Sequence, residues 1–151
     1  TGNLNYTADG IATVATNKTV NGSVVNSTGT NSMGTLVFQG NSAMTGTIGA
    51  SGAALKEVKT TGASGTTASF ANSVYATTMT VGGTGSVALN ANLNGDLNYT
   101  QDGRVDLKAG NNITGLVKAS AVNTGTPPAR LAAPRNSASA SRPRSHSRIQ
   151  N

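Results

Sequence analysis

Two aspartates in a repeated seven-residue motif are the first residues whose type and spacing could do chemistry. Asp9 lies in LNYTADG, residues 4–10, and Asp102 has the same place in LNYTQDG, residues 97–103. Carboxylates in a repeated loop could bind calcium or hydrogen-bond a sugar. Asp-Gly is also a common turn, because Asp tolerates and Gly prefers a positive φ. The turn interpretation is favoured, and no metal site is expected.

A glycine-rich stretch offers the closest approach to a calcium loop. Calcium-binding β-rolls use Gly-Gly-x-Gly-x-Asp, in which the aspartate supplies ligand oxygens. Residues 82–87 read Gly-Gly-Thr-Gly-Ser-Val, so the glycines are present and the aspartate is missing. The two Asp-Gly motifs in turn lack the glycine run. We therefore predict no metal and no cofactor.

Catalytic groups are sparse and scattered. The only histidine, His146, lies in an Arg/Ser-rich stretch with no acid nearby, so a Ser/His/Asp arrangement has no scaffold. The five carboxylates are dispersed, and a polysaccharide-cleaving enzyme would need acids clustered in a groove. The sequence predicts no catalytic residue and a protein that is not an enzyme.

The composition points to ordered β structure without a conventional globular core. The 151 residues include two Phe, three Tyr, no Trp, no Cys and 19 Gly. Only 11% are charged while Val, Ile and Thr are frequent, which is unlike a disordered chain. Without cysteine there is no disulfide framework or thiolate metal site. The start at Thr1, without a signal peptide or an apolar run that could span a bilayer, suggests an internal piece of a longer product.

An internal repeat relates the two motifs. Residues 1–27 match residues 94–120 at a constant offset of 93, with ten identities in 27 positions. Apolar bursts such as IATV (11–14) and RVDL (104–107) recur within the copies, and Gly or Asn-Gly turns separate them. The evenly spaced short strands fit a sandwich or a solenoid, and the scarcity of aromatic residues favours the solenoid.

The fold prediction is all-β. We expect a right-handed parallel β-helix or β-solenoid of short strands punctuated by Gly and Asn over residues 1–125, followed by a disordered tail over residues 126–151. Val, Ile, Leu, Ala and Thr would fill its narrow interior, and asparagines near the turns would stack as ladders between coils. The offset of 93 would span about four coils. Asp9 and Asp102 would then occupy equivalent positions in different coils, far apart.

The tail differs in charge from the rest of the chain. Residues 1–125 carry six basic against five acidic side chains, whereas residues 126–151 carry five arginines and no acid. An arginine-rich tail can neutralise phosphates, but this one has no aromatic residue for stacking on bases, so no nucleic acid partner is expected. All four prolines follow Thr126. A second interpretation is an out-of-frame continuation of the gene, which its DNA sequence would test.

Several longer stretches carry a family resemblance. These are GTLVFQGNSAMTGTIGASGAALKEVK (34–59), SFANSVYATTMTVGGTGSVALNANLNGDL (69–97) and GNNITGLV (110–117). They resemble the passenger regions of rickettsial-type autotransporter surface antigens, the outer membrane protein B group. The resemblance covers most of residues 1–125 and rests on diffuse repeated patterns. It implies a β-helical passenger, exported by type V secretion and exposed on the bacterial outer membrane.

The resemblance also implies a role. The segment would serve in a surface layer or in adhesion, with a host-cell receptor or neighbouring passenger copies as partners and with no membrane-spanning segment of its own. The alternative is a separate β-solenoid binding module for a glycan, ice or calcium. Ice binding would require regular Thr-x-Thr rows, and the better-defined strands supply only Thr78-Met79-Thr80.

Overall fold

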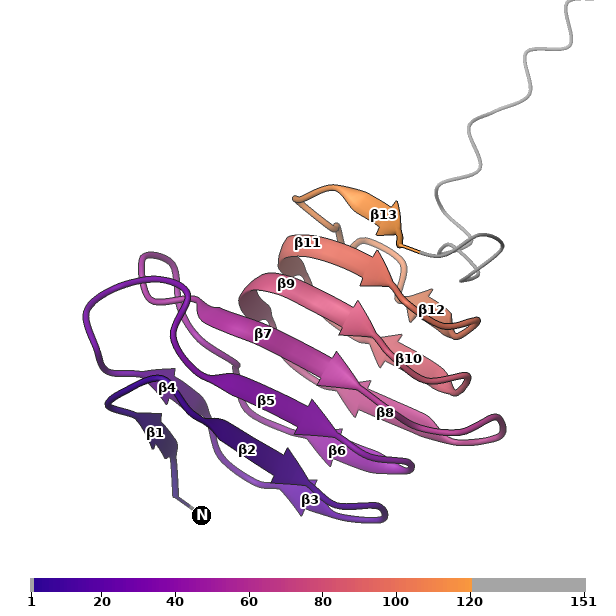
Figure 1. The fold of residues 1–151 in the computed structure, drawn as a ribbon, viewed down its shortest axis with the longest axis horizontal. Helices are drawn as coiled ribbons and strands as arrows, with labels where there is room; N and C mark the ends of the chain where they lie inside the picture. Colours follow the sequence, from indigo (N-terminus) through magenta and orange to yellow (C-terminus); the bar gives the residue numbers. More distant parts are fainter. Residues whose placement is uncertain (1, 121–151) are drawn as a thin grey trace, which may run out of the picture.

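The computed structural model describes residues 2–120, and they form a solenoid of about six turns with no helix (Figure 1). Every strand pairs with its neighbours in parallel. The strands are β1 (Leu4–Tyr6), β2 (Ile11–Val14), β3 (Thr19–Val20), β4 (Val24–Asn26), β5 (Thr35–Phe38), β6 (Ser42–Met44), β7 (Leu55–Thr60), β8 (Thr67–Phe70), β9 (Val74–Val81), β10 (Ser86–Leu89), β11 (Leu93–Tyr99), β12 (Arg104–Leu107) and β13 (Val117–Ala119).

Each coil passes through three faces. The long face is a six-stranded sheet in the order β13-β11-β9-β7-β5-β2, and the middle face is a five-stranded sheet in the order β12-β10-β8-β6-β3. The short face begins each coil. It contains the β1–β4 pair and a line of single residues joined by parallel bridges: Leu4, Val24, Ile48, Val74, Leu93 and Ile113.

The coils differ in length. Successive residues of the short-face line lie 20, 24, 26, 19 and 20 positions apart in the sequence. Strands β9 and β11 are long enough to run from the short face onto the long face, with a register shift between Asn94 and Asp96 at the bend. Extra residues are therefore accommodated mainly in the turns, and one extra residue of β9 is accommodated by this register shift.

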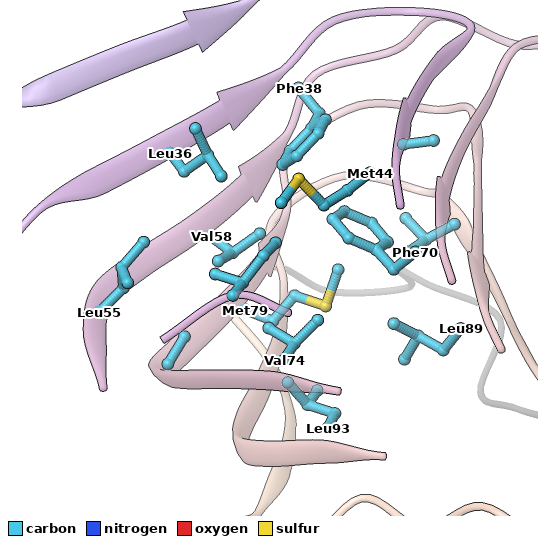
Figure 2. Close-up of a cluster of buried hydrophobic side chains, with 14 of the residues drawn as sticks. Leu36, Phe38, Met44, Leu55, Val58, Phe70, Val74, Met79, Leu89 and Leu93 are labelled. Carbon is cyan, nitrogen blue, oxygen red and sulfur yellow. The ribbon is translucent and has the colours of Figure 1, made fainter. Parts of the chain in front are cut away.

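Inward-facing side chains stack in rows along the solenoid and form its core (Figure 2). One row of the long face contains Leu36, Val58, Met79 and Leu97 at paired positions, all fully buried. The two phenylalanines also lie inside, where Phe38 meets Phe70 edge to face with ring centroids 4.8 Å apart. Aliphatic residues thus fill most of the interior, and both phenylalanines close the space between the long and middle faces.

Buried polar groups are satisfied. Asn26, only 3% exposed, donates from Nδ2 to the carbonyl oxygens of Thr30 and Ala54, at 2.6 and 3.0 Å. Its Oδ1 accepts from the backbone N–H and the hydroxyl of Thr28. Among the described residues, no buried side-chain nitrogen or oxygen lacks a partner. Asn26 therefore holds the loop between β4 and β5 against the next coil.

The fold prediction is confirmed: the described chain is an all-β parallel solenoid, and strands appear at IATV and RVDL. The expected asparagine stacks take a different form. Asn31, Asn41 and Asn92 accept backbone N–H groups of the following coil instead of bonding to other asparagine side chains. Residues 121–151, including the tail and His146, lie outside the described residues.

Candidate functional site

Asp9 lies in the turn between β1 and β2, where it binds two later coils. Its Oδ1 accepts the backbone N–H of Gly34 at 3.1 Å, and its Oδ2 lies 2.8 Å from Nζ of Lys56. The hydrogen bond from Lys56, then that from Gly34, lowers the pKa of Asp9, and the aspartate in turn raises the pKa of Lys56. The carboxylate is therefore used to join coils.

Asp102 lies at a different corner of the coil. Asp9 connects the short face to the long face, whereas Asp102 connects β11 of the long face to β12 of the middle face. Its exposed carboxylate forms no hydrogen bond with another of residues 2–120. The expectation that Asp9 and Asp102 occupy equivalent positions is wrong, because Leu4 begins on the short face and Leu97 lies on the long face.

The sequence repeat is nevertheless reproduced in strand pairing and in several backbone hydrogen bonds. Residues 4–6 pair with 24–26 in the same register as residues 97–99 pair with 117–119. Two backbone bonds also recur at the offset of 93. The bond from Leu4 N to Ser23 O recurs as Leu97 N to Leu116 O, and the bond from Ser27 N to Tyr6 O recurs as Ser120 N to Tyr99 O. The repeated unit is thus a whole coil. Its first copy starts on the short face, and its second copy starts on the long face.

The expectation that glycine provides a positive φ in the Asp-Gly turns is also wrong. Neither Gly10 nor Gly103 has a positive φ, whereas Asn17 and Gly110, again 93 residues apart, have φ values of 61° and 91°. Gly103 is needed for a close approach, since an added Cβ would lie 2.5 Å from the carbonyl oxygen of Gly83. The left-handed turn of each copy therefore lies after the second strand and not at Asp-Gly.

The other three acids of the described chain also have partners within it. Asp96 accepts the backbone N–H of Leu116 at 2.9 Å and pairs with Lys118 at 2.6 Å, and these contacts lower its pKa. Glu57 accepts from the hydroxyl of Thr80, and Asp106 pairs with Arg104. Within residues 2–120, no three His, Cys, Asp or Glu side chains come together as metal ligands would.

The Gly82–Gly85 stretch has a packing role. A Cβ on Gly83 would run into the carbonyl oxygen of Gly62 in the preceding coil, and one on Gly85 would lie 2.7 Å from the carbonyl oxygen of Ala63. These glycines let two turns stack closely, as glycine does wherever backbones approach one another. The resemblance to a calcium loop therefore has a structural cause.

A shallow open groove of about 410 Å³ crosses three successive turns between the long and middle faces. It is lined by residues that the sequence did not single out: Thr16, Gln39, Gly40, Thr61, Gly62, Ala63 and Thr66. They come from the β2–β3, β5–β6 and β7–β8 turns, and no motif connects them in sequence. The groove offers hydroxyl and amide groups for hydrogen bonding.

The comparisons with known proteins add no identity. No family model, curated protein or solved structure matches this chain. Residues 2–120 contain no helix with the length and apolar character that a membrane crossing would need. The arrangement that the described residues do present is a stack of coils joined by their own polar side chains.

Proposed function

We propose that this chain is a segment of a non-enzymatic bacterial surface passenger, exported by type V secretion and acting in a surface layer or in adhesion to host cells. One observation carries the proposal: side-chain oxygens at the turns join successive coils at four of the five junctions between coils. Asparagine or aspartate oxygens of one coil accept backbone N–H groups of the following coil, in the pairs Asn3–Ser23, Asp9–Gly34, Asn31–Ala54, Asn41–Thr67, Asn92–Asn112 and Asp96–Leu116.

This pattern suits an exported, elongated protein. An enzyme would place polar side chains in a pocket. In this chain they accept hydrogen bonds from backbone N–H groups at the turns. Each coil depends mainly on its nearest neighbours, so a solenoid can fold progressively as coils are added. The absence of cysteine is compatible with passage across an envelope in an unfolded state. The polar turns remain outside and available to a receptor or to neighbouring copies.

Surface exposure is tested with antibodies against the folded chain on cells of the organism that encodes it. We expect labelling of intact cells, and loss of that labelling after mild protease treatment that leaves a cytoplasmic marker untouched. Labelling that appears only after permeabilisation would refute a surface location. Beads coated with the folded chain should also bind host cells if the role is adhesion, and lattice formation without bead binding would assign the role to a surface layer.

A glycan-binding module is the second candidate, and the groove favours it. Thr16 and Gln39 are exposed there and present a hydroxyl and an amide. The described lining includes no aromatic ring on which a sugar could stack, so we expect weak binding. NMR titration with short oligosaccharides would show shifts at the groove that Gln39→Ala reduces. Unchanged spectra would exclude this candidate.

A further inference from the structure

The turns between the long and middle faces stack above one another along one side of the solenoid (Figure 1). The groove of about 410 Å³ crosses three successive turns of this stack, those of the first three coils. In a parallel solenoid each turn is displaced from the previous one by about 4.8 Å. This spacing is close to the length of one pyranose unit in an extended polysaccharide. A sugar chain laid along the solenoid axis would therefore present one sugar to each turn.

Two glycines keep the groove hollow. A Cβ on Gly62 would lie 3.4 Å from Cα of Gly40 in the preceding turn and would run into the hydroxyl of Thr66. A Cβ on Gly40 would lie 2.7 Å from Cγ2 of Thr16. No side chain projects from either glycine, so the backbone of these turns is open to a ligand between walls that carry hydroxyl groups.

Polar side chains of the groove are available for hydrogen bonds. Thr16 and Gln39 are exposed, and neither side chain forms a hydrogen bond within residues 2–120. The exposed hydroxyl of Thr61 donates to the carbonyl oxygen of Phe38 at 3.4 Å and keeps its capacity to accept. These groups match sugar hydroxyls, but exposed hydrogen bonds compete with water and contribute little each. A ligand that binds firmly here therefore needs a further contact.

Lys59 supplies such a contact at the third turn. It lies in β7 two residues before Thr61, and the intervening Thr60 is buried, so Lys59 and Thr61 face the same outer side. Gly82 lies beside Thr61 in the following coil, and Cε of Lys59 is 2.9 Å from the point where a Cβ on Gly82 would be. The lysine stem thus lies over the notch left by Gly82, and its ammonium group, one bond further, lies at the rim of the groove.

The positive charge at this rim is not neutralised. Lys59 forms no ion pair with another of residues 2–120. Glu57, two positions away on the same side of β7, accepts the hydroxyl of Thr80 instead. Lys18 follows Thr16 by two positions in the β2–β3 turn and is likewise exposed and unpaired in the described chain. No lining residue is a carboxylate, so the groove attracts anions.

We infer that the groove binds an acidic oligosaccharide along the solenoid axis, with a carboxylate or sulfate group on Lys59 and sugar hydroxyls on Gln39 and Thr61. A hydrogen bond from an ammonium group to an anion is stronger than one between neutral groups, so Lys59 selects acidic over neutral sugars. The inference deepens the second candidate function, a glycan-binding module, and rests on it. Carboxylate and sulfate present the same chemistry to a lysine, and the test separates them.

The test is an NMR titration of the full chain with three tetrasaccharides. Tetragalacturonate carries carboxylates, its fully methyl-esterified form has the same hydroxyls without the charge, and a sulfated galactan tetrasaccharide carries sulfates. At least one acidic ligand should give saturable amide shifts confined to the three turns and should bind at least about tenfold more tightly than the ester. Binding of tetragalacturonate alone would assign a carboxylate ligand, and binding of the sulfated sugar alone would assign a sulfate ligand. Salt at about 0.5 M should weaken the acidic ligand and not the ester.

Matched lysine variants locate the selecting charge. Lys59→Gln should weaken the acidic tetrasaccharide at least about fivefold and leave the weak binding of the ester unchanged, which a general loss of the fold would not do. Lys108→Gln is the control and should stay within about twofold of the parent. Lys108 is exposed and unpaired in the described chain, and it follows β12 at the corner between the middle and short faces. If Lys59→Gln does not fold, the comparison of acid and ester on the parent chain still decides.

The outcomes separate this inference from the function on which it rests. Equal binding of the ester and the acidic ligands at the three turns would overturn the acidic class and leave a glycan-binding module standing. No shift with any of the three sugars at about 10 mM would overturn both. Equal losses in Lys59→Gln and Lys108→Gln would show a general attraction of anions to the chain and would overturn the inference as well.

Discussion

The carboxylate of Asp9 lies 2.8 Å from the ammonium group of Lys56, across 47 positions of sequence. Asp9 belongs to the first coil and Lys56 to the third, while Gly34, which donates to the other oxygen, belongs to the second. One exposed aspartate therefore joins three successive coils. Its identical counterpart in sequence, Asp102, lies at another corner and forms no hydrogen bond with the described residues.

Asp9→Asn should lower stability slightly at neutral pH, whereas Asp102→Asn should leave it unchanged. Asparagine can still accept from Gly34 but loses the ion pair with Lys56. Because folding lowers the pKa of Asp9 below 3.8, its contribution is present above that value and is lost as the pH falls through the folded pKa. Urea unfolding midpoints measured from pH 7 to pH 2 should converge for Asp9→Asn and the parent at the acid end. Equal effects of the two substitutions would contradict the assignment.

Gly95→Ala should destabilise the solenoid strongly. Gly95 has a φ of 152°, and an added Cβ would run into the carbonyl oxygen of Ala76 in the preceding coil. Since that neighbour is backbone, relief requires separation of the coils, and we expect a loss of at least about 2 kcal/mol. Gly10→Ala is the matched control, because Gly10 has open space around it and no positive φ. Its unfolding free energy should stay within about 1 kcal/mol of the parent value.

Phe70→Ala should remove a central part of the core. Phe70 is 1% exposed and packs against Phe38 at an interplanar angle of 75°. Truncation of a buried phenylalanine leaves a cavity that costs about 3–5 kcal/mol. Ile11→Ala is the control, since Ile11 is 77% exposed and should change stability by less than about 0.5 kcal/mol. Chemical unfolding of the two variants would measure both values, and similar losses would place Ile11 in a buried environment.

Local patterns were sufficient to predict the strands and their parallel stacking. Apolar bursts such as residues 11–14 and 104–107 form strands, because alternate side chains must face a common core. The corner occupied by each motif could not be predicted in the same way. The first four coils together span 89 residues, so an offset of 93 carries Leu4 of the short face to Leu97 of the long face. The length of each coil depends on the number of residues in its turns, and the turns show no periodic pattern of apolar residues.

The groove and the hydrogen bonds between coils could likewise not be predicted from the sequence. Gln39 and Thr61 are brought together by stacking of turns that lie in different coils. The acceptor role of Asn31 depends on which amide of the next coil stands opposite, here Ala54. Such pairings follow from the register between coils, and the register follows from turn lengths. A single sequence shows the composition of the turns but not their alignment.

Tyr99 should make the fold sensitive to alkaline pH. Its side chain is 2% exposed, and burial, followed by the negative charge of Asp106, raises the pKa of Tyr99 to about 12. The unfolded chain releases this proton near pH 10, so the contribution of Tyr99 is fully present below pH 10 and is lost as the pH rises to about 12. Unfolding midpoints of Tyr99→Phe should therefore fall less between pH 10 and 12 than those of the parent. Tyr75→Phe, which alters a partly exposed ring, should keep the parent's alkaline loss, and an identical decline in both variants would show that Tyr99 does not cause it.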